Sequence, residues 1–494
     1  MASDLKQKAI SGMIWTAIQK YSVYIIQFIS GIVLARLLTP YDFGCIGMLS
    51  IFMCLAQSFI DSGFGSALIQ KKQPTEQDYS SIFWWNIVMA IVMYAIVYVS
   101  APFIASFYNI PILSRVLRVQ GIVLIIYAFN IIQQNQLRKK LNFRLLSVVS
   151  IISSVTALSV TVWMARSGFG VWSLVVQNIL TTSIPAVVFW IKVKWKPKFL
   201  FSKSSFKELF SFGFYMFMTD LLNTLGKQIQ GLLIGRFYNP TIMGYYSNAK
   251  RSEELACSSV SQVITQVTYP LYSEVQDDKV RLSNMIKRLT TTLAYLSFPM
   301  MFILLLCAKP LFIVLYSDKW LPSASYFQIL CIAGLALCLQ SVNTQAIAAI
   351  GKSRVMFKWT VVKRIVNVAL VVMGVVLGGV KGLLYGIVID TWFSYFVNIG
   401  LVAKYIGYRV GDQIRHLFPI LLVSVIATGI SYITGYLLDM TMYVDAAVKV
   451  SIFLLIYIGW SLVFKPDSFL YFKGTVMPMV KNFGKKICIF TKTR

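Results

Sequence analysis

The sequence predicts a polytopic α-helical membrane protein, and three observations lead to this fold class. The 494 residues are 57% hydrophobic and 13% charged, with a mean hydropathy of +0.70, which leaves too little polar surface for a water-soluble globule of this size. Long apolar runs without period-two alternation favour helices over barrel strands. Basic residues gather in alternate connections between the runs. This composition excludes a soluble enzyme.

Fourteen apolar runs are each long enough for a membrane-spanning helix, which needs about 20 mostly apolar residues. The first run follows Lys6 and Lys8 and extends to about Leu38 with no small-residue cleavage site soon after it, so we expect an uncleaved first span. The second and eighth runs are the least apolar. The runs lie at residues 12–36, 44–69, 83–107, 116–136, 146–165, 170–191, 209–235, 242–270, 289–315, 325–350, 356–378, 382–403, 417–438 and 447–464.

The distribution of charge predicts the topology. The chain has 46 Lys and Arg against 18 Asp and Glu, a formal charge of +28, which in a soluble protein would suggest a nucleic-acid partner. However, 33 of the cations fall in the termini and the even-to-odd connections, and only nine fall in the odd-to-even connections. This positive-inside bias predicts that both termini are cytoplasmic, and it explains the charge without nucleic acid. Basic segments on that side are expected to contact membrane lipids.

An internal repeat divides the predicted spans into two lobes. A shift of 200 residues aligns GIVLARLLTPYDFG with GLLIGRFYNPTIMG without a gap, so that Pro40 and Gly44 correspond to Pro240 and Gly244. The alternative is coincidence, because Gly and Pro recur at helix ends for turn reasons alone. Duplication predicts two pseudo-symmetric six-helix bundles with a pseudo-two-fold axis along the membrane normal. The parts are an N-terminal lobe at 1–191, a cytoplasmic connector at 192–208, a C-terminal lobe at 209–403, two further transmembrane helices at 404–465 and a basic cytoplasmic tail at 466–494.

The seventh run carries a stripe of polar residues. Asp220, Asn223, Lys227 and Gln230 are spaced 3, 4 and 3 residues apart, which places all four on one helix face. The 200-residue shift places Lys20 of the first run on Asp220. An ionisable group within a span costs roughly 2.5 kcal/mol or more unless it is paired or faces water. The stripes therefore predict a water-filled cavity between the two halves.

A cationic cavity with amide and hydroxyl groups suits an anionic, hydroxyl-rich cargo such as a sugar attached to phosphate. For two of the cations internal pairing is the alternative, because Lys250 and Arg251 both lie at helical pairing distance from Glu254. The candidate substrate-binding residues are Lys20, Gln27, Asn223, Lys227, Gln230 and Arg251.

Acidic residues within spans are candidates for coupling to an H+ or Na+ gradient, although Asp220 could instead only neutralise Lys227. The coupling candidates are Asp61, Asp220 and Asp390.

No metal site or cofactor is predicted. The seven cysteines contain no Cys-x-x-Cys pair, and the only histidine is His416. The glycines at residues 376–386 are expected to ease a tight turn between the eleventh and twelfth spans rather than to bind phosphate, and no P-loop is present.

The sequence resembles a known family, most clearly near its N-terminus. The stretches VLARLLTPYDFGCIGMLSIF and FIDSGFGSALIQKKQPTEQDYSSIFWWNI are similar to the start of the polysaccharide transport family, within the superfamily of multidrug exporters and peptidoglycan-precursor flippases. The chain most resembles the colanic-acid and lipopolysaccharide exporter (Wzx-type) group. The resemblance covers nearly the whole chain and its span count. It implies a flippase of the bacterial inner membrane that moves undecaprenyl-pyrophosphate-linked oligosaccharide to the periplasmic leaflet by alternating access.

Two other functions remain open. A multidrug or small-solute exporter of the same superfamily would favour a smaller, more acidic or aromatic cavity. A membrane glycan polymerase or ligase would need a sizeable external loop, and no predicted external loop exceeds about a dozen residues. The expected partners are a lipid-linked oligosaccharide and membrane lipids, with possible association with a polysaccharide polymerase and assembly proteins, and no enzymatic activity is expected.

Overall fold

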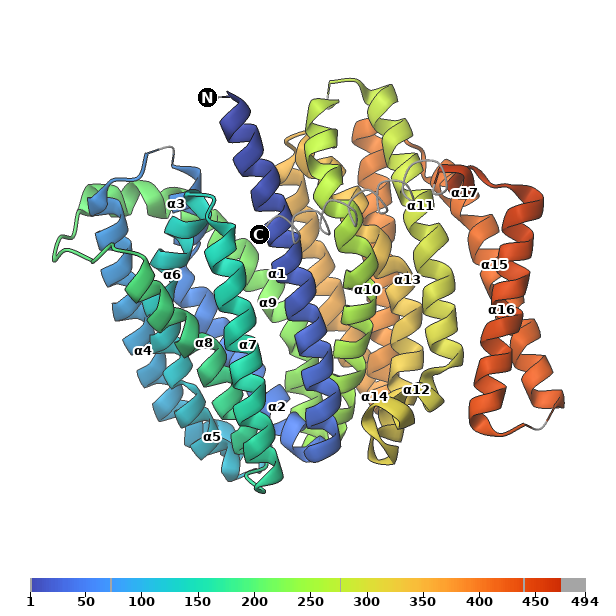
Figure 1. Cartoon of the computed structure of the whole chain (residues 1–494), viewed down its shortest axis with the longest axis horizontal. Helices are drawn as coiled ribbons and strands as arrows, with labels where there is room; N and C mark the ends of the chain where they lie inside the picture. The colour runs from blue at the N-terminus through green and yellow to red at the C-terminus, as the bar shows by residue number, and fades with distance from the viewer. Residues whose placement is uncertain (1, 72, 276, 439, 472–494) are drawn as a thin grey trace, which may run out of the picture. The chain divides into compact units, whose positions relative to one another are not determined.

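The computed structural model describes residues 2–71, 73–275, 277–438 and 440–471 (Figure 1). The described residues form helices joined by short connections, with no strand among them. The chain divides into two compact units, Met1–Ser247 and Asn248–Arg494. The predicted fold class, an all-helical polytopic membrane protein, is confirmed at this level. The predicted basic tail lies outside the described residues from residue 472 onward.

Unit 1 is a bundle in which α1 packs on α7, α7 on α8, and α6 on both α8 and α4. The first turns of α10 also belong to it. Its helices are α1 (Ala2–Leu37), α2 (Pro40–Asp61), α3 (Phe64–Gln70), α4 (Glu76–Tyr108), α5 (Ile112–Gln120), α6 (Ile122–Lys139), α7 (Phe143–Arg166), α8 (Val171–Lys192), α9 (Lys203–Phe237) and α10 (Pro240–Glu274).

In unit 2, α13 packs on α11 and α14, and α15 packs on α11 and α16. Its elements after α10 are α11 (Lys279–Leu306), α12 (Ala308–Tyr316), the 3-10 helix η1 (Asp318–Trp320), α13 (Leu321–Ala349), α14 (Ser353–Ile406), α15 (Val410–Leu437), α16 (Met442–Phe464) and α17 (Asp467–Tyr471).

Helix α14 is a hairpin of two helices. Its path reverses at Gly378 and Gly379, and Gly379 has a φ of +62°, which favours glycine. A Cβ on Gly374 would lie 2.4 Å from the carbonyl oxygen of Gly382, so the two arms approach backbone to backbone. The predicted glycine turn between the eleventh and twelfth runs is confirmed.

Eleven helical segments of the described residues are long and apolar enough to cross a membrane. One of them, Arg354–Ile406, contains both arms of the α14 hairpin and therefore two of the predicted runs. The predicted runs at 209–235 and 242–270 lie in α9 and α10, which are 35 residues long but are not among the eleven. The total of fourteen spans remains a prediction.

The boundary between the compact units differs from the boundary between the predicted lobes. Unit 1 continues through α9, because α9 packs antiparallel along α2. Ser58 Oγ donates a hydrogen bond to Asp220 Oδ2 at 2.7 Å, and Ser50 Oγ donates to Gln228 Oε1 at 2.9 Å. The first helix of the predicted C-terminal lobe thus packs on α2 of the predicted N-terminal lobe.

The first turns of α2 and α10 meet at positions that the 200-residue shift relates. A Cβ on Gly44 would lie 1.7 Å from the carbonyl oxygen of Pro240, and a Cβ on Gly244 would lie 1.9 Å from that of Pro40. Only hydrogen fits on the Cα atom at either position, since real Cβ atoms do not approach oxygen so closely. We call this reciprocal contact the Pro-Gly clasp.

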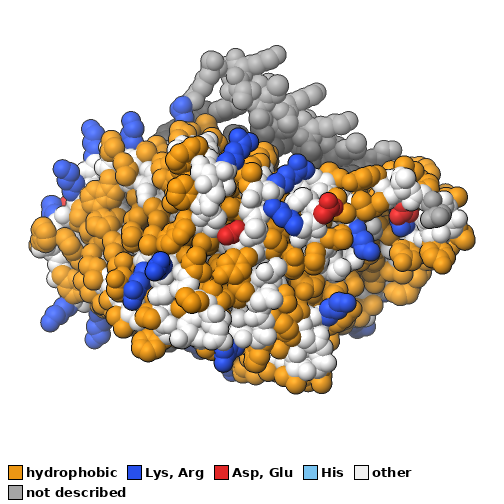
Figure 2. Space-filling view, turned by 90° about the horizontal axis from the view of Figure 1, so that it is seen from below, with side chains coloured by type: hydrophobic (Ala, Val, Ile, Leu, Met, Phe, Trp, Pro, Cys, Tyr) orange, Lys and Arg blue, Asp and Glu red, His pale blue; other side chains and the backbone are white. Residues whose placement is uncertain are grey.

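Much of the outer surface is apolar. Figure 2 shows hydrophobic side chains over much of the visible face, with basic side chains scattered among them and few acidic ones. On α4, Phe103 and Val99 are 72% and 65% exposed. Hydrocarbon contact removes the penalty that such exposure would carry in water.

The start of α4 is held by a capping box joined to an ion pair. Asp78 Oδ2 accepts a hydrogen bond from the Thr75 amide at 2.8 Å, while the Asp78 amide donates to Thr75 Oγ1. The Asp78 side chain is fully buried (0% exposed) and lies 3.1 Å from Lys71 Nζ. Lys71 also contacts Glu208 Oε2 at 2.9 Å. The carboxylate of Glu208 raises the pKa of Lys71, with Asp78 adding to the effect, so this lysine stays charged at neutral pH.

Replacing this aspartate, as Asp78→Ala, is expected to destabilise unit 1 by about 2 kcal/mol, because it removes a cap and one partner of a buried ion pair. Thermal unfolding in detergent measures the change. Asp42→Ala is a matched control, since Asp42 forms the same type of capping box with Thr39, and among the described residues no ion pair of Asp42 is found. Equal losses of stability in the two variants would contradict a contribution from the ion pair.

Candidate functional site

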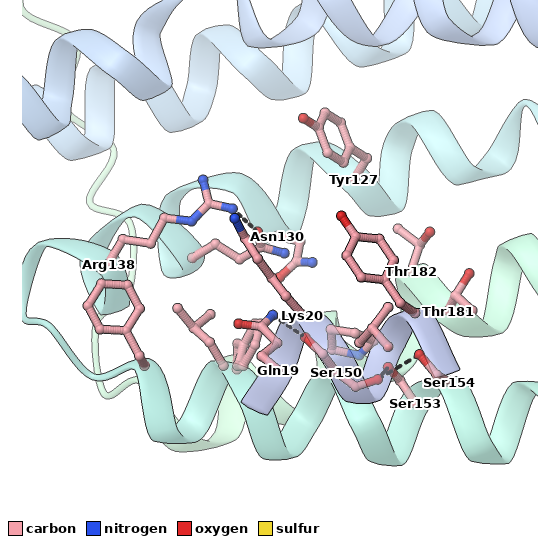
Figure 3. A pocket seen from close by; sticks show the side chains of 17 residues that line it. Gln19, Lys20, Tyr127, Asn130, Arg138, Ser150, Ser153, Ser154, Thr181 and Thr182 are labelled. Atoms are coloured by element: carbon pink, nitrogen blue, oxygen red, sulfur yellow. Dashed lines mark hydrogen bonds between the residues drawn. The ribbon is translucent and has the colours of Figure 1, made fainter. Parts of the chain in front are cut away.

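A polar cavity of about 570 Å³ lies within unit 1, between α1, α6, α7 and α8 (Figure 3). Each of the four helices contributes polar side chains to its wall, and apolar residues such as Leu146 and Phe189 complete the lining. The polar lining residues are Gln19, Lys20, Tyr24, Tyr127, Asn130, Gln134, Arg138, Ser150, Ser153, Ser154, Thr181 and Thr182.

Two cations share this cavity. Lys20 comes from α1, and Arg138 comes from the last turn of α6. Figure 3 shows both side chains reaching toward the same region of the cavity, near Asn130. The guanidinium of Arg138 lies 3.5 Å from Gln134 Oε1, one turn back along α6. Both side chains are exposed to the open side of the cavity, and two cations close together there make it attractive to an anion with more than one charge.

Hydroxyl groups on α7 and α8 line the opposite wall. Ser153 Oγ and Ser154 Oγ both donate to the carbonyl oxygen of Ser150, at 3.0 and 2.8 Å, and Thr182 Oγ1 donates to that of Asn178 at 3.0 Å. The hydroxyl protons are therefore used within the helices, which leaves oxygen lone pairs as acceptors for ligand hydroxyls. Gln19 Nε2 donates to Ser150 Oγ at 3.0 Å and so joins α1 to this wall.

The predicted stripe on α9 follows one helix, but its members have different surroundings. Asp220 is held by Ser58, and Gln230 is buried and accepts a hydrogen bond from Tyr246 Oη at 3.2 Å. Lys227 is exposed, and Asn223 is partly buried. On α1, Gln27 is exposed. None of the stripe residues lines the cavity.

Asp61 interacts both with a residue of the α9 stripe and with a cation of the cavity. Its Oδ1 accepts a hydrogen bond from the Gly65 amide at 3.3 Å, and the carboxylate interacts electrostatically with Asp220 and Arg138. Tyr127, which lines the cavity, interacts with the same three charged groups. Two of the predicted coupling carboxylates, Asp61 and Asp220, therefore belong to one electrostatic group that includes a cavity cation.

The other candidates lie in unit 2. Lys250 pairs with Glu253 at 2.8 Å and lies 3.8 Å from Glu254. The internal-pairing alternative thus holds for Lys250, with the fully buried Glu253 as its nearer partner. Arg251 interacts electrostatically with Tyr316, which also lies 3.2 Å from the hydroxyl of Ser252.

Asp390 is buried in the α14 hairpin. Its Oδ2 accepts a hydrogen bond from Asn367 Nδ2 at 2.7 Å, across the two arms. Lys363 and Arg364 on the first arm interact electrostatically with this carboxylate. Lys363 Nζ also donates to Asn398 Oδ1 at 3.1 Å. Among the described residues, no group of three or more His, Cys, Asp or Glu residues could hold a metal ion.

Arg138 lines the cavity but was not predicted as a site residue. The positive-inside count placed it in a cytoplasmic connection. A signal for it exists in α6, where Tyr127, Asn130, Gln134 and Arg138 are spaced 3, 4 and 4 residues apart and all line the cavity. This stripe runs to the end of α6, so its last residue, Arg138, falls among the cations of the following connection.

The comparison with protein families covers more than half of the chain. Residues 33–325 match the family described as "Polysaccharide biosynthesis protein". The chain belongs to this family. The resemblance seen in the sequence is thereby confirmed.

Curated relatives support the same assignment. The chain is 28% identical over 361 residues to the teichuronic acid biosynthesis protein TuaB of Bacillus subtilis (strain 168), which covers 72% of this chain and 74% of that protein. It is 22% identical over 445 residues to the lipopolysaccharide biosynthesis protein WzxC of Escherichia coli (strain K12), covering 88% and 89%. The succinoglycan biosynthesis transport protein ExoT of Rhizobium meliloti (strain 1021) is 24% identical over 364 residues, covering 74% of each.

Solved structures show the same fold. The lipid II flippase MurJ in an inward closed conformation matches with a TM-score of 0.76 at 16% identity, covering 92% of this chain and 99% of that one. An inward-facing multidrug resistance MATE family transporter matches with a TM-score of 0.62 at 14% identity, covering 83% and 98%. The relatives and neighbours whose names state an activity are transport proteins, and the expectation that this chain is a transporter rather than an enzyme agrees with them.

Proposed function

We propose that this protein is a flippase that moves undecaprenyl-pyrophosphate-linked oligosaccharide repeat units, destined for capsule, O-antigen or exopolysaccharide, from the cytoplasmic to the periplasmic leaflet of the bacterial inner membrane. The observation that carries the proposal is the cavity in unit 1, where Lys20 and Arg138 face hydroxyl and amide walls. A pyrophosphate needs cations to bind it, and a sugar hydroxyl needs both hydrogen-bond donors and hydrogen-bond acceptors.

In this mechanism the polyprenyl tail stays in lipid while the headgroup enters the protein. Lys20 and Arg138 attract the pyrophosphate, and Asn130, Gln134 and the serines of α7 contact the sugars. The candidates outside this cavity, Gln27, Asn223, Lys227, Gln230 and Arg251, would contact the cargo along its path. The predicted lobes rock against each other, and each ligand state shifts the balance between inward-open and outward-open forms.

Coupling to an ion gradient belongs to the same proposal. Asp61 interacts with both Asp220 and Arg138, so a proton or Na+ bound there would change the charge that the anionic cargo meets. Asp390 is a separate coupling candidate in unit 2. No cofactor takes part. Association with a polysaccharide polymerase and assembly proteins would place the flipped cargo next to the proteins that use it. In the same proposal, both termini lie in the cytoplasm.

Deletion of the coding gene, followed by analysis of lipid-linked glycans, tests the function. We expect loss of a surface polysaccharide while full-length repeat units accumulate on the inner leaflet, because synthesis continues without export. Unaltered glycans together with increased drug sensitivity would instead identify a multidrug exporter. Loss of polymer with repeat units already in the periplasmic leaflet would point to a polymerase or ligase.

A further inference from the structure

The connector between α8 and α9 is an extended segment with two different faces. Residues 194–198 have no helical turn, and Val193 has extended backbone angles. Val193 is buried, and Trp195 and Pro197 are partly buried, whereas the alternate residues are exposed. This period of two is that of an extended chain lying on a surface. The exposed residues of this alternation are the lysines Lys192, Lys194, Lys196 and Lys198.

The inner face of the connector is packed firmly on unit 1. Val193 joins a buried cluster with Leu137, Leu146, Val149 and Phe189. The ring of Trp195 meets that of Phe83 edge-on at 6.0 Å. Such packing holds the segment against the helices, in contrast to a freely moving linker.

Hydrogen bonds hold the same segment to α4. The amide of Lys198 donates to Ser80 Oγ at 3.2 Å, and the amide of Ser202 donates to Ser81 Oγ at 2.9 Å. The indole of Trp84 donates to the carbonyl oxygen of Lys198 at 2.9 Å. The lysines on the outer face are therefore presented in a fixed row, about 7 Å apart from one to the next.

Apolar side chains continue the outer surface beyond the lysines. Phe199 is 90% exposed and Phe201 is 52% exposed, and the ring of Phe199 stacks on Trp84 at 4.7 Å. Trp84 lies two turns into α4, about 12 Å along the helix from Glu76. Lysines and exposed aromatic rings therefore lie side by side on this surface, a combination that suits the headgroup region of a bilayer.

We propose that residues 192–201 form a binding surface for anionic phospholipids of the leaflet at this end of unit 1. Lys192, Lys194 and Lys196 bind the phosphate-bearing headgroups, while Phe199 and Phe201 insert among the upper acyl chains. Lys198 is occupied by Glu76, at 2.7 Å, and takes no part. An acidic protein segment would match the lysines, but it would leave the exposed surfaces of the two rings in water. The inference is independent of the cargo.

Native mass spectrometry of the full chain with added phosphatidylglycerol or phosphatidylcholine tests this surface. The wild type is expected to retain phosphatidylglycerol in preference to phosphatidylcholine. The triple variant Lys192→Gln/Lys194→Gln/Lys196→Gln is expected to lose at least tenfold of that preference, because each lysine near an anionic surface contributes roughly fivefold in affinity. An unchanged preference would overturn the proposal.

A matched variant separates this surface from net charge. Lys352→Gln/Arg354→Gln/Lys358→Gln removes three exposed cations at the start of α14 in unit 2 and is expected to keep most of the preference. Equal losses in the two triple variants would overturn the proposal in favour of a general charge effect. Phe199→Ser/Phe201→Ser is expected to weaken retention of both lipids, and retention unchanged by this variant would overturn the insertion step. Glycan export does not enter these measurements, so their failure is distinct from failure of the flippase proposal.

Discussion

Removing both cavity cations, as Lys20→Ala/Arg138→Ala, is expected to lower glycan export at least 100-fold while the protein level stays near that of the wild type. A hydrogen bond to a charged group contributes about 1.5 to 3 kcal/mol, which corresponds to roughly 10- to 100-fold for each cation. Both side chains line the same cavity, so each single variant is expected to retain partial export. Accumulation of lipid-linked repeat units, normalised to membrane protein level, measures the effect.

Two controls make this result specific to the cavity. Lys140→Ala removes an exposed cation two residues beyond Arg138 that does not line the cavity, and export is expected to stay normal. Lys20→Arg keeps the charge and is expected to restore most of the export lost in Lys20→Ala. Wild-type export by the double alanine variant would remove the proposed anion site. Full export by Lys20→Ala alone would assign the site to Arg138.

The fold class could be predicted from the sequence because its determinants are local. Apolar length, charge asymmetry and glycine position each act within a few tens of residues. The α14 hairpin is an example, because its turn at Gly378 and Gly379 was predicted from the glycines alone. The division into compact units could not be predicted in the same way. It depends on α9 packing along α2 through pairs such as Ser58 and Asp220, which are 162 residues apart. Nothing in the sequence around Ser58 or Asp220 indicates which helix each side chain faces.

The candidate site was predicted in part, for a physical reason that concerns side-chain direction. Lys20 lies mid-helix, so its cost in hydrocarbon marked it, and the structure places it in the cavity. Arg138 lies in the last turn of α6, where a count of loop cations takes it as topology. The Cα–Cβ bonds of a helix tilt toward its N-terminus, so a long side chain in the last turn reaches back along the helix. The position of Arg138 in the sequence therefore does not show that its side chain reaches the cavity.

The choice of partner for Lys250 shows a similar limit. The sequence predicts Glu254, four residues on, as the partner, although helical spacing allows Glu253, three residues on, equally. The structure places the fully buried Glu253 nearer, at 2.8 Å against 3.8 Å. Burial decides between them, because a carboxylate removed from water needs its cation more than an exposed one does.

Valine at either glycine of the Pro-Gly clasp is expected to abolish export and to lower thermal stability by more than about 3 kcal/mol, at or beyond the upper end of the usual cost of overpacking. At Gly44 the obstacle is the backbone oxygen of Pro240, which cannot turn aside as a side chain does. The first turns of α2 and α10 would have to separate. In the proposed cycle these turns lie at the periplasmic end, where the protein must open to release its cargo, so the clasp is expected to close that end.

The reciprocity of the clasp gives its sharpest test, because Gly44 and Gly244 occupy equivalent positions and act on one contact. Gly44→Ala and Gly244→Ala are each expected to destabilise the protein by a similar amount, and the double variant by clearly less than the sum, since one Cβ already separates the helices. Gly429→Ala in α15, where a Cβ meets nothing within 4 Å, serves as the control and is expected to be neutral or slightly stabilising. Differential scanning fluorimetry in detergent measures all four variants. Additive losses would mean that the two glycines act separately, and the clasp would then not be a single contact.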